Sequence, residues 1–193
     1  MEWKDLKEVL KIYKEGIETG MATFETIVPS EQVWDERHHA TLRFVAEEHN
    51  RVVGWIGISP VSTRAVYYGV GEVSVYISSD SKGKGIASKL FKILIEESEK
   101  AGFWTLQSSI FAINTSSIQL HKKMGFRVVG TREKIAQLKG ECLVLGKVEC
   151  VQIDEEIYAG NYKIAINKWR PLASLAGDFA GLMPSFSYGQ KGR

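Results

Sequence analysis

The chain begins with apolar residues spaced three or four positions apart, as on one face of a helix. This pattern predicts an amphipathic helix over residues 5–16 that ends near Gly16. Small and polar residues predict a loop over residues 18–29. Ser30 can cap a helix and acidic residues follow it, so we expect a second helix from Ser30 to about Arg43.

Alternating apolar and polar residues follow, which is the pattern of strands. Residues 43–48 and 51–58 lie on either side of His49-Asn50 and predict a β-hairpin. The pattern then switches between strands and helices as far as residue 129. In chain order it predicts a strand at 72–77, a helix at 86–101 ended by Gly102, a strand at 105–111, a helix at 116–124 ended by Gly125, and a strand at 126–129.

This order of elements predicts an α/β (α+β) protein in which helices flank a central sheet. The pattern weakens beyond Gly140. Residues 141–153 fit one or two strands. Residues 176–193 show neither helical nor strand periodicity, so we expect a flexible tail there.

The composition is that of a globular protein and gives no sign of a nucleic-acid or membrane partner. The chain has 193 residues, 44% of them hydrophobic and 25% charged, which suits one globular domain. Its 25 basic and 23 acidic residues give a net charge of +2, so no large electrostatic field favours a nucleic acid or an anionic membrane as partner. No run approaches the roughly 20 apolar residues of a membrane span, and the charged N-terminus lacks a signal-peptide pattern. We therefore expect a cytoplasmic protein with Cys142 and Cys150 reduced.

A glycine-spaced basic turn, KGKGIA from Lys82 to Ala87, precedes the helix at 86–101. A helix N-terminus offers unpaired N–H groups and a partial positive charge, which together bind phosphate. A dinucleotide-binding turn needs a third glycine where Ser88 stands, and a P-loop needs a glycine followed by Lys and then Ser or Thr. The turn fits instead the pattern [QRK]-x-x-G-x-[GA], which binds the pyrophosphate of coenzyme A. Taken alone, it is explained equally well as a solvated basic cap.

Four stretches in order along the chain resemble the GCN5-related N-acetyltransferases, and most closely the branch of phosphinothricin and methionine-sulfone-type acetyltransferases. The resemblance covers residues 1–140 and implies the GNAT fold, with a mixed, mostly antiparallel sheet. It also implies transfer of an acetyl group from acetyl-CoA to the primary amine of a small amino-acid-like acceptor. The matching stretches are Ile12-Tyr13 with Ala22-Thr23-Phe24-Glu25, Glu72 to Ile77, Lys82 to Ala87, and Asn114 to His121 with Met124-Gly125-Phe126.

The sequence departs from this family in three places. Family members begin with a short strand, whereas this chain begins almost at its first helix. Lys82 stands where the family has Arg or Gln. The family pattern is broken at residues 139–144, and one hypothesis is that the C-terminus is a frameshifted or replaced segment. We therefore expect an acetyltransferase domain over 1–140, an atypical strand region over 141–175 and a flexible tail over 176–193.

The resemblance also implies roles around acetyl-CoA as the co-substrate, with no metal. The strand edge at Val75, Tyr76 and Ile77 would pair with the pantetheine arm, and Asn114 would bind that arm from the far side. The residues expected to hold the pyrophosphate are Lys82, Gly83, Lys84, Gly85, Ile86, Ala87 and Ser88.

Glu72 is the first candidate for the base that deprotonates the acceptor ammonium, and His121 could act as an acid, a base or a substrate-orienting group. Phe24 and Glu25 are expected to line the acceptor site, where Arg64 could bind a carboxylate. Three of these residues also have a plain explanation: Glu72 as a solvent-facing strand carboxylate, His121 as a polar residue on a short helix, and Arg64 as an exposed loop cation. The implied partners are a small-molecule amine and a second copy of the chain in a homodimer. An inactive acyl-CoA-binding protein and a protein N-acetyltransferase remain alternatives.

Overall fold

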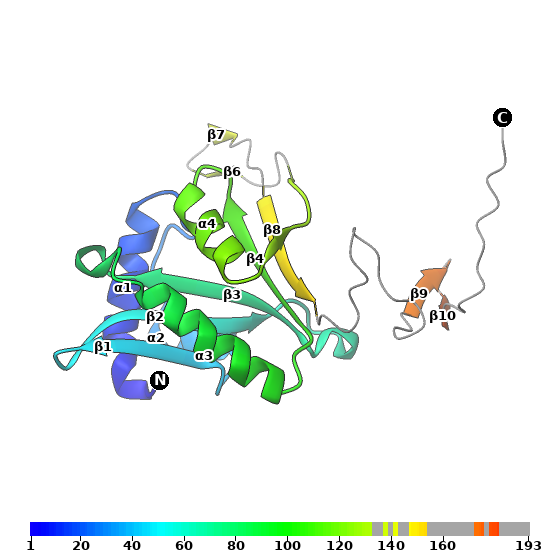
Figure 1. Cartoon of the computed structure of the whole chain (residues 1–193), viewed down its shortest axis with the longest axis horizontal. Helices are drawn as coiled ribbons and strands as arrows, with labels where there is room; N and C mark the ends of the chain where they lie inside the picture. The colour runs from blue at the N-terminus through cyan, green and yellow to red at the C-terminus, as the bar shows by residue number, and fades with distance from the viewer. Residues whose placement is uncertain (133–136, 139–140, 143–146, 154–171, 176–177, 182–193) are drawn as a thin grey trace. The chain divides into compact units, whose positions relative to one another are not determined.

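The computed structural model describes residues 1–132, 137–138, 141–142, 147–153, 172–175 and 178–181 (Figure 1). Two compact units divide the chain, Met1–Gln152 and Ile153–Arg193. The first unit carries the sheet and all the helices of the described residues. No helix in the described ranges is both long and apolar enough to cross a membrane.

A mixed sheet forms the centre of the first unit. Its strands lie in the order β1-β2-β3-β4-β8-β5. The pairs β1–β2, β2–β3 and β5–β8 are antiparallel, and β3–β4 is parallel. The predicted fold class, a mostly antiparallel sheet flanked by helices, is therefore confirmed. The strands are β1 (Arg43–Glu48), β2 (Arg51–Pro60), β3 (Val70–Ile77), β4 (Thr105–Phe111), β5 (Arg127–Val128) and β8 (Lys147–Ile153).

Helices cover both faces of this sheet (Figure 1). On one face, Leu90, Phe91 and Leu94 of α3 (Ile86–Lys100) join a core cluster with Ile56 and Ile58 of β2. Because side chains alternate along a strand, the neighbours of Ile56 and Ile58 in the chain point to the other face. There Trp55 packs in a second cluster with Leu6, Val9 and Ile12 of α1 (Leu6–Glu18) and with Trp34 of α2 (Glu31–Arg37). The remaining helices are α4 (Thr115–Lys123) and the short 3-10 turns η1 (Trp3–Asp5), η2 (Ala65–Tyr67) and η3 (Ser79–Ser81).

The first helix is longer than the sequence pattern predicts. Helix α1 passes through Gly16 to Glu18, and Gly20, with a φ of +65°, follows its end. Gly16 serves packing instead of termination, because a Cβ at this position would lie 2.5 Å from the ring of Tyr76. The glycine lets α1 approach β3 closely.

The second helix is shorter than predicted. Helix α2 ends at Arg37, and the expected extension to Arg43 is wrong. The intervening residues pair with the sheet: His39 N donates to Ile58 O at 2.8 Å, and Ile58 N donates to Leu42 O at 3.1 Å. Sheet pairing therefore competes successfully with helix formation over this stretch.

Short antiparallel pairs occupy the C-terminal part of the described chain. Strand β6 (Gln137–Leu138) pairs with β7 (Glu141–Cys142), and in the second unit β9 (Leu172–Leu175) pairs with β10 (Asp178–Gly181). Strand β10 lies where the sequence showed no strand periodicity. The remainder of the expected tail, residues 176–177 and 182–193, lies outside the described residues.

Candidate functional site

The parallel strands β3 and β4 pair over only three residues each. Their register runs from Val70↔Thr105 to Glu72↔Gln107, while β3 continues to Ile77. Beyond Glu72 the two strands diverge, as their different directions in Figure 1 show. Strand β2 still pairs with β3 on the other side as far as Ile77. The divergence therefore opens one edge of β3, and an open strand edge can pair with an extended ligand.

Two adjoining cavities lie at this divergence. The larger, here the turn cavity, has a volume of about 480 Å³, and the smaller, here the carboxylate cavity, about 230 Å³. They share five lining residues, so they lie side by side along the open edge of β3 and together form the candidate cleft. The shared residues are Ala22, Val75, Tyr76, Asn114 and Ser117.

The turn cavity brings together nearly all the residues predicted to bind a coenzyme. Its lining includes Val75, Tyr76, Ile77, Lys82, Gly83, Gly85, Ile86, Ala87, Ser88 and Asn114. Lys84 is placed differently, because its Nζ donates to Oε2 of Glu48 at 2.9 Å. Lys82 is thus the basic residue of the turn that lines the cavity.

The geometry of the turn requires glycine. Gly83 and Gly85 have φ values of +78° and +75°, in the left-handed region that disfavours residues with a Cβ. Gly85 is the N-cap of α3 and provides no side-chain cap. The first N–H groups of this 15-residue helix therefore remain available to a ligand, together with the positive end of the helix dipole. Such a turn is suited to a phosphate group.

Asn114 connects two elements of the cleft. Its Oδ1 accepts a hydrogen bond from Ser117 N at 3.1 Å and so caps α4, while its Nδ2 donates to Met21 O at 3.2 Å. These bonds fix the loop after α1 against the start of α4. Asn114 thereby shapes both cavities, whether or not it contacts a ligand.

Glu72 lies where the β3–β4 pairing ends, and it lines the carboxylate cavity. Its Oε2 accepts from Gln107 Nε2 at 2.7 Å, and its Oε1 accepts from Ser109 N at 3.1 Å. Both donors come from β4, so the carboxylate bridges the diverging strands. The half-buried Glu72 is therefore an oriented acceptor of hydrogen bonds and a negative charge facing the cavity.

His121 is buried in the wall of the carboxylate cavity, with 1% of its surface exposed. Its ring packs edge-on against Phe91 and Phe126, with centroids 4.9 and 5.2 Å apart. Nδ1 lies 2.8 Å from Ser117 O, so this nitrogen carries the proton and donates to the carbonyl. Burial lowers the pKa of His121, which favours the neutral ring. Nε2 then has a lone pair and no hydrogen-bond partner among the described residues, so it can accept a hydrogen bond or a proton.

The three residues predicted for the acceptor site are not all brought together. Phe24 lines the carboxylate cavity, edge-on to Phe111 at a centroid distance of 4.7 Å. Glu25 instead accepts a bond from Arg37 Nη1 at 3.1 Å. Arg64 is exposed directly before η2, outside the residues that line the two cavities.

Several lining residues were not predicted from the sequence. Ser74 shares the face of β3 with Glu72 and Tyr76, and the period of two along a strand was a signal that could have identified it. Tyr13 reaches the same cavity from α1 and packs edge-on to Tyr76 at 5.0 Å. Burial raises the pKa of Tyr76, and its hydroxyl donates to Ala22 O at 3.3 Å. Tyr76 therefore stays protonated and holds the loop after α1.

In the comparison with known proteins, a family model, two curated relatives and a solved structure all carry the description of acetyltransferases. The family described as "Acetyltransferase (GNAT) family" matches residues 3–126. The "Putative phosphinothricin acetyltransferase YwnH" of Bacillus subtilis (strain 168) is 32% identical over 145 residues, which cover 72% of this chain and 89% of that protein. An "L-methionine sulfoximine/L-methionine sulfone acetyltransferase" of Pseudomonas paraeruginosa (strain DSM 24068 / PA7) is 28% identical over 147 residues, covering 73% and 86%. A crystal structure of a phosphinothricin acetyltransferase from Sinorhizobium meliloti in complex with AcCoA has a TM-score of 0.71 and 28% identity, and covers 79% of this chain and 85% of that one.

Proposed function

Because the chain belongs to the acetyltransferase (GNAT) family, we propose that it transfers the acetyl group of acetyl-CoA to the primary amine of a small amino-acid-like acceptor. The observation that carries this proposal is the pair of adjoining cavities along the open edge of β3, which together form the cleft. One end of the cleft has the uncapped glycine turn, and the other has the carboxylate of Glu72. The names of the relatives, which act on phosphinothricin or on methionine sulfoximine and sulfone, support a small acceptor with an amino-acid core.

The residues of the turn cavity fit acetyl-CoA. The turn offers glycine backbone, the start of α3 and Lys82 to the pyrophosphate. The open edge at Val75, Tyr76 and Ile77 offers backbone groups to the amide-containing pantetheine arm. This placement directs the thioester toward the shared wall of the two cavities, and so toward the acceptor.

The reaction needs a free amine, because an ammonium has no lone pair with which to attack. The amine nitrogen bonds to the thioester carbonyl carbon and loses a second proton as the amide forms. The carbon–sulfur bond breaks, and the coenzyme leaves as a thiolate that takes up this proton. A thiol pKa near 8.5 makes this departure easy. The proton lost by the ammonium passes to Glu72, directly or through water.

Glu72 combines two requirements of this step. Its negative charge attracts the ammonium, and the bonds from Gln107 and Ser109 fix its position. Glu72 is therefore well placed to orient the ammonium and to take its proton. His121 contributes the second acceptor through Nε2 on the same cavity. We assign it the role of orienting the amine or relaying its proton.

The acceptor's remaining groups are recognised on the side of the loop after α1. Phe24 offers an apolar wall, and Glu25 contributes through the ion pair that ties this loop to Arg37. Arg64 stays our proposed ligand for the acceptor carboxylate, since its guanidinium can make a bidentate contact, although it lies outside the residues that line the two cavities. We further propose that the protein is a cytoplasmic homodimer that needs no metal and has no nucleic-acid or membrane partner. Light scattering of the purified protein would test whether it is a dimer.

The experiment that tests the function is thiol release from acetyl-CoA in the presence of an amine panel. The panel contains phosphinothricin, methionine sulfone, methionine sulfoximine, ordinary L-amino acids and a short peptide. We expect release with at least one free amino acid and none with the peptide. Coenzyme binding without release on any acceptor would defeat the enzyme proposal, and release with the peptide alone would reassign the acceptor to proteins.

A further inference from the structure

The tip of the β1–β2 hairpin places two opposite charges side by side. His49 and Asn50 have φ values of 52° and 60°, the left-handed pair of a tight type I′ turn. This turn makes Glu48 and Arg51 direct cross-strand partners. Because only two residues connect the strands here, the side chains of Glu48 and Arg51 are held in a fixed position relative to each other.

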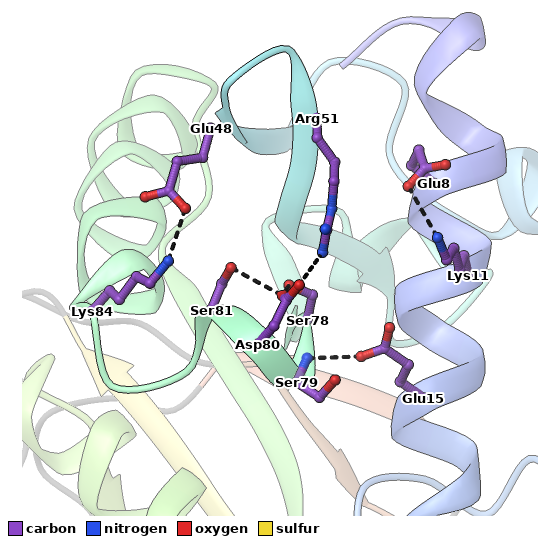
Figure 2. A network of polar contacts seen from close by, with 10 residues as sticks. All are labelled: Glu8, Lys11, Glu15, Glu48, Arg51, Ser78, Ser79, Asp80, Ser81 and Lys84. Carbon is purple, nitrogen blue, oxygen red and sulfur yellow. Dashed lines mark hydrogen bonds and ion pairs between the residues drawn. The ribbon is translucent and has the colours of Figure 1, made fainter.

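Each of these charges bonds to one side of the glycine turn. Figure 2 shows Glu48 bound to Lys84 and Arg51 bound to Asp80. Lys84 and Asp80 flank the segment Ser81–Gly83, which lines the turn cavity. The hairpin tip thus contacts the chain on both sides of Ser81–Gly83, the first of the two lining stretches of the turn.

Asp80 also binds the serines of the segment that leads into the glycine turn. Its Oδ1 accepts from Ser78 Oγ at 2.7 Å and from Ser81 Oγ at 3.2 Å (Figure 2). These bonds and the Arg51 guanidinium hold the pKa of Asp80 well below its usual range, so it stays ionised. Ser78 and Ser81 are both buried, and Ser78 N donates to Val53 O of β2 at 2.9 Å. Asp80 therefore joins the hairpin to the polypeptide that leads into the turn.

Helix α1 holds the same segment from its other side. Oε2 of Glu15 accepts from Ser79 N at 2.7 Å, within the network drawn in Figure 2. The turn itself contains Gly83 and Gly85, and glycine gives the free backbone more conformations than any other residue. Without external contacts, ordering this turn would consume part of the binding free energy of a ligand.

We propose that Glu48 and Arg51 are positioning residues that clamp the glycine turn in its ligand-binding conformation. The inference rests on the proposed function, because the ligand is taken to be acetyl-CoA. It assigns Lys84 to the clamp and leaves Lys82 as the basic side chain that meets the pyrophosphate. The clamp orders the turn before the coenzyme arrives, so it acts on coenzyme affinity and leaves the chemical step unchanged.

The competing explanation is that Lys84 binds the pyrophosphate directly and Glu48 merely competes for it. The two explanations predict opposite results for Glu48→Gln. Release of Lys84 from Glu48 tightens coenzyme binding if Lys84 is a direct ligand. The same release weakens binding if the ion pair positions the turn.

Titration calorimetry with acetyl-CoA on the full chain decides between them. We expect Glu48→Gln and Lys84→Gln each to raise Kd roughly two- to fivefold, the scale of one exposed ion pair. The double variant should be no weaker than the weaker single, because both changes remove one interaction. The charge exchange Glu48→Lys with Lys84→Glu should restore Kd to within about twofold. Lys92→Gln, an exposed lysine about two turns into α3, is the matched control and should leave Kd unchanged.

Three results would overturn the clamp. They are tighter binding by Glu48→Gln, a charge exchange that binds as weakly as Lys84→Glu alone, and a control Lys92→Gln whose Kd rises as its thermal stability falls. Melting temperatures of the ligand-free variants, measured in parallel, should agree within the error of the control. If the unaltered chain binds the coenzyme but transfers no acetyl group, the proposed function is wrong. The Kd values of the variants would still test the clamp. No binding by the unaltered chain would overturn both.

Discussion

The backbone N–H of Ser109 donates to Oε1 of Glu72 at 3.1 Å, at the point where the pairing of β3 with β4 ends. One side chain thus takes the place of a backbone acceptor that the diverging strand no longer offers. The cost of an unpaired amide is avoided, and a carboxylate is fixed at the mouth of the cleft. The divergence of β3 and β4 thus both opens the sheet and positions the negative charge of Glu72.

Replacing Glu72 with Gln should therefore separate chemistry from binding. The amide can still accept from Ser109 N, but it carries no charge and cannot take a proton. We expect kcat to fall at least about a hundredfold, the usual contribution of a general base. The KM for acetyl-CoA should stay within about twofold, because Glu72 lies outside the turn cavity. Steady-state kinetics with Glu99→Gln, an exposed carboxylate at the end of α3, as control would measure both; equal losses in kcat and coenzyme affinity would mean a structural role.

Acid should destabilise the protein through the buried His121 and the half-buried His38. Burial lowers the pKa of both His121 and His38 in the folded chain. The unfolded chain then binds protons more readily than the folded chain, and stability falls as the pH drops below the unfolded value near 6.5. Each histidine adds at most about 1.4 kcal/mol per pH unit to this slope. Urea unfolding between pH 8 and 5 should show a shallower loss for His121→Gln than for the unaltered chain, and an unchanged slope would contradict the neutral assignment of His121.

The sequence predicts the cleft only in part, and particular residues show why. Glu72 could be found because it opens an alternating strand within a matching motif, and the glycine turn because its spacing is local. Gln107 and Ser109 could not, since their roles depend on a parallel register that α3 sets through the crossover connection. Lys84 was assigned to the ligand because a sequence shows charge but not its partner, and Glu48 lies 36 residues away. Non-local pairing also explains the early end of α2.

Substitution of Gly85 by a residue with a side chain should lower stability or coenzyme affinity, although there is room for the side chain. A Cβ there would have no neighbour within 4 Å, so the cost arises from its φ of +75° alone. We expect Gly85→Ala to lose about 1–2 kcal/mol of stability, or to shift the turn and weaken acetyl-CoA binding. Gly85→Asn should lose less, since asparagine tolerates this region. Gly130→Ala, where the structure shows neither a positive φ nor a close neighbour, is the control; similar losses at both sites in urea unfolding would refute the conformational explanation.

Gly16 offers the opposite case, where the backbone is ordinary and space is lacking. Alanine should strengthen an isolated helix by up to about 1 kcal/mol relative to glycine. Here the added Cβ would lie 2.5 Å from the ring of Tyr76, so α1 and β3 must separate or Tyr76 must turn. Overpacking of this kind costs typically 1–3 kcal/mol, which exceeds the gain in propensity.

The displaced ring gives Gly16→Ala a functional signature as well. Tyr76 lines both cavities and holds the loop after α1 through its bond to Ala22 O. We expect the KM values for acetyl-CoA and for the amine to rise together, alongside lower stability in urea. The double change Gly16→Ala with Tyr76→Leu removes the ring and should recover part of the stability lost in the single variant. If Gly16→Ala instead raised the melting temperature, helix propensity would dominate at this position and the close approach of α1 to β3 would not matter.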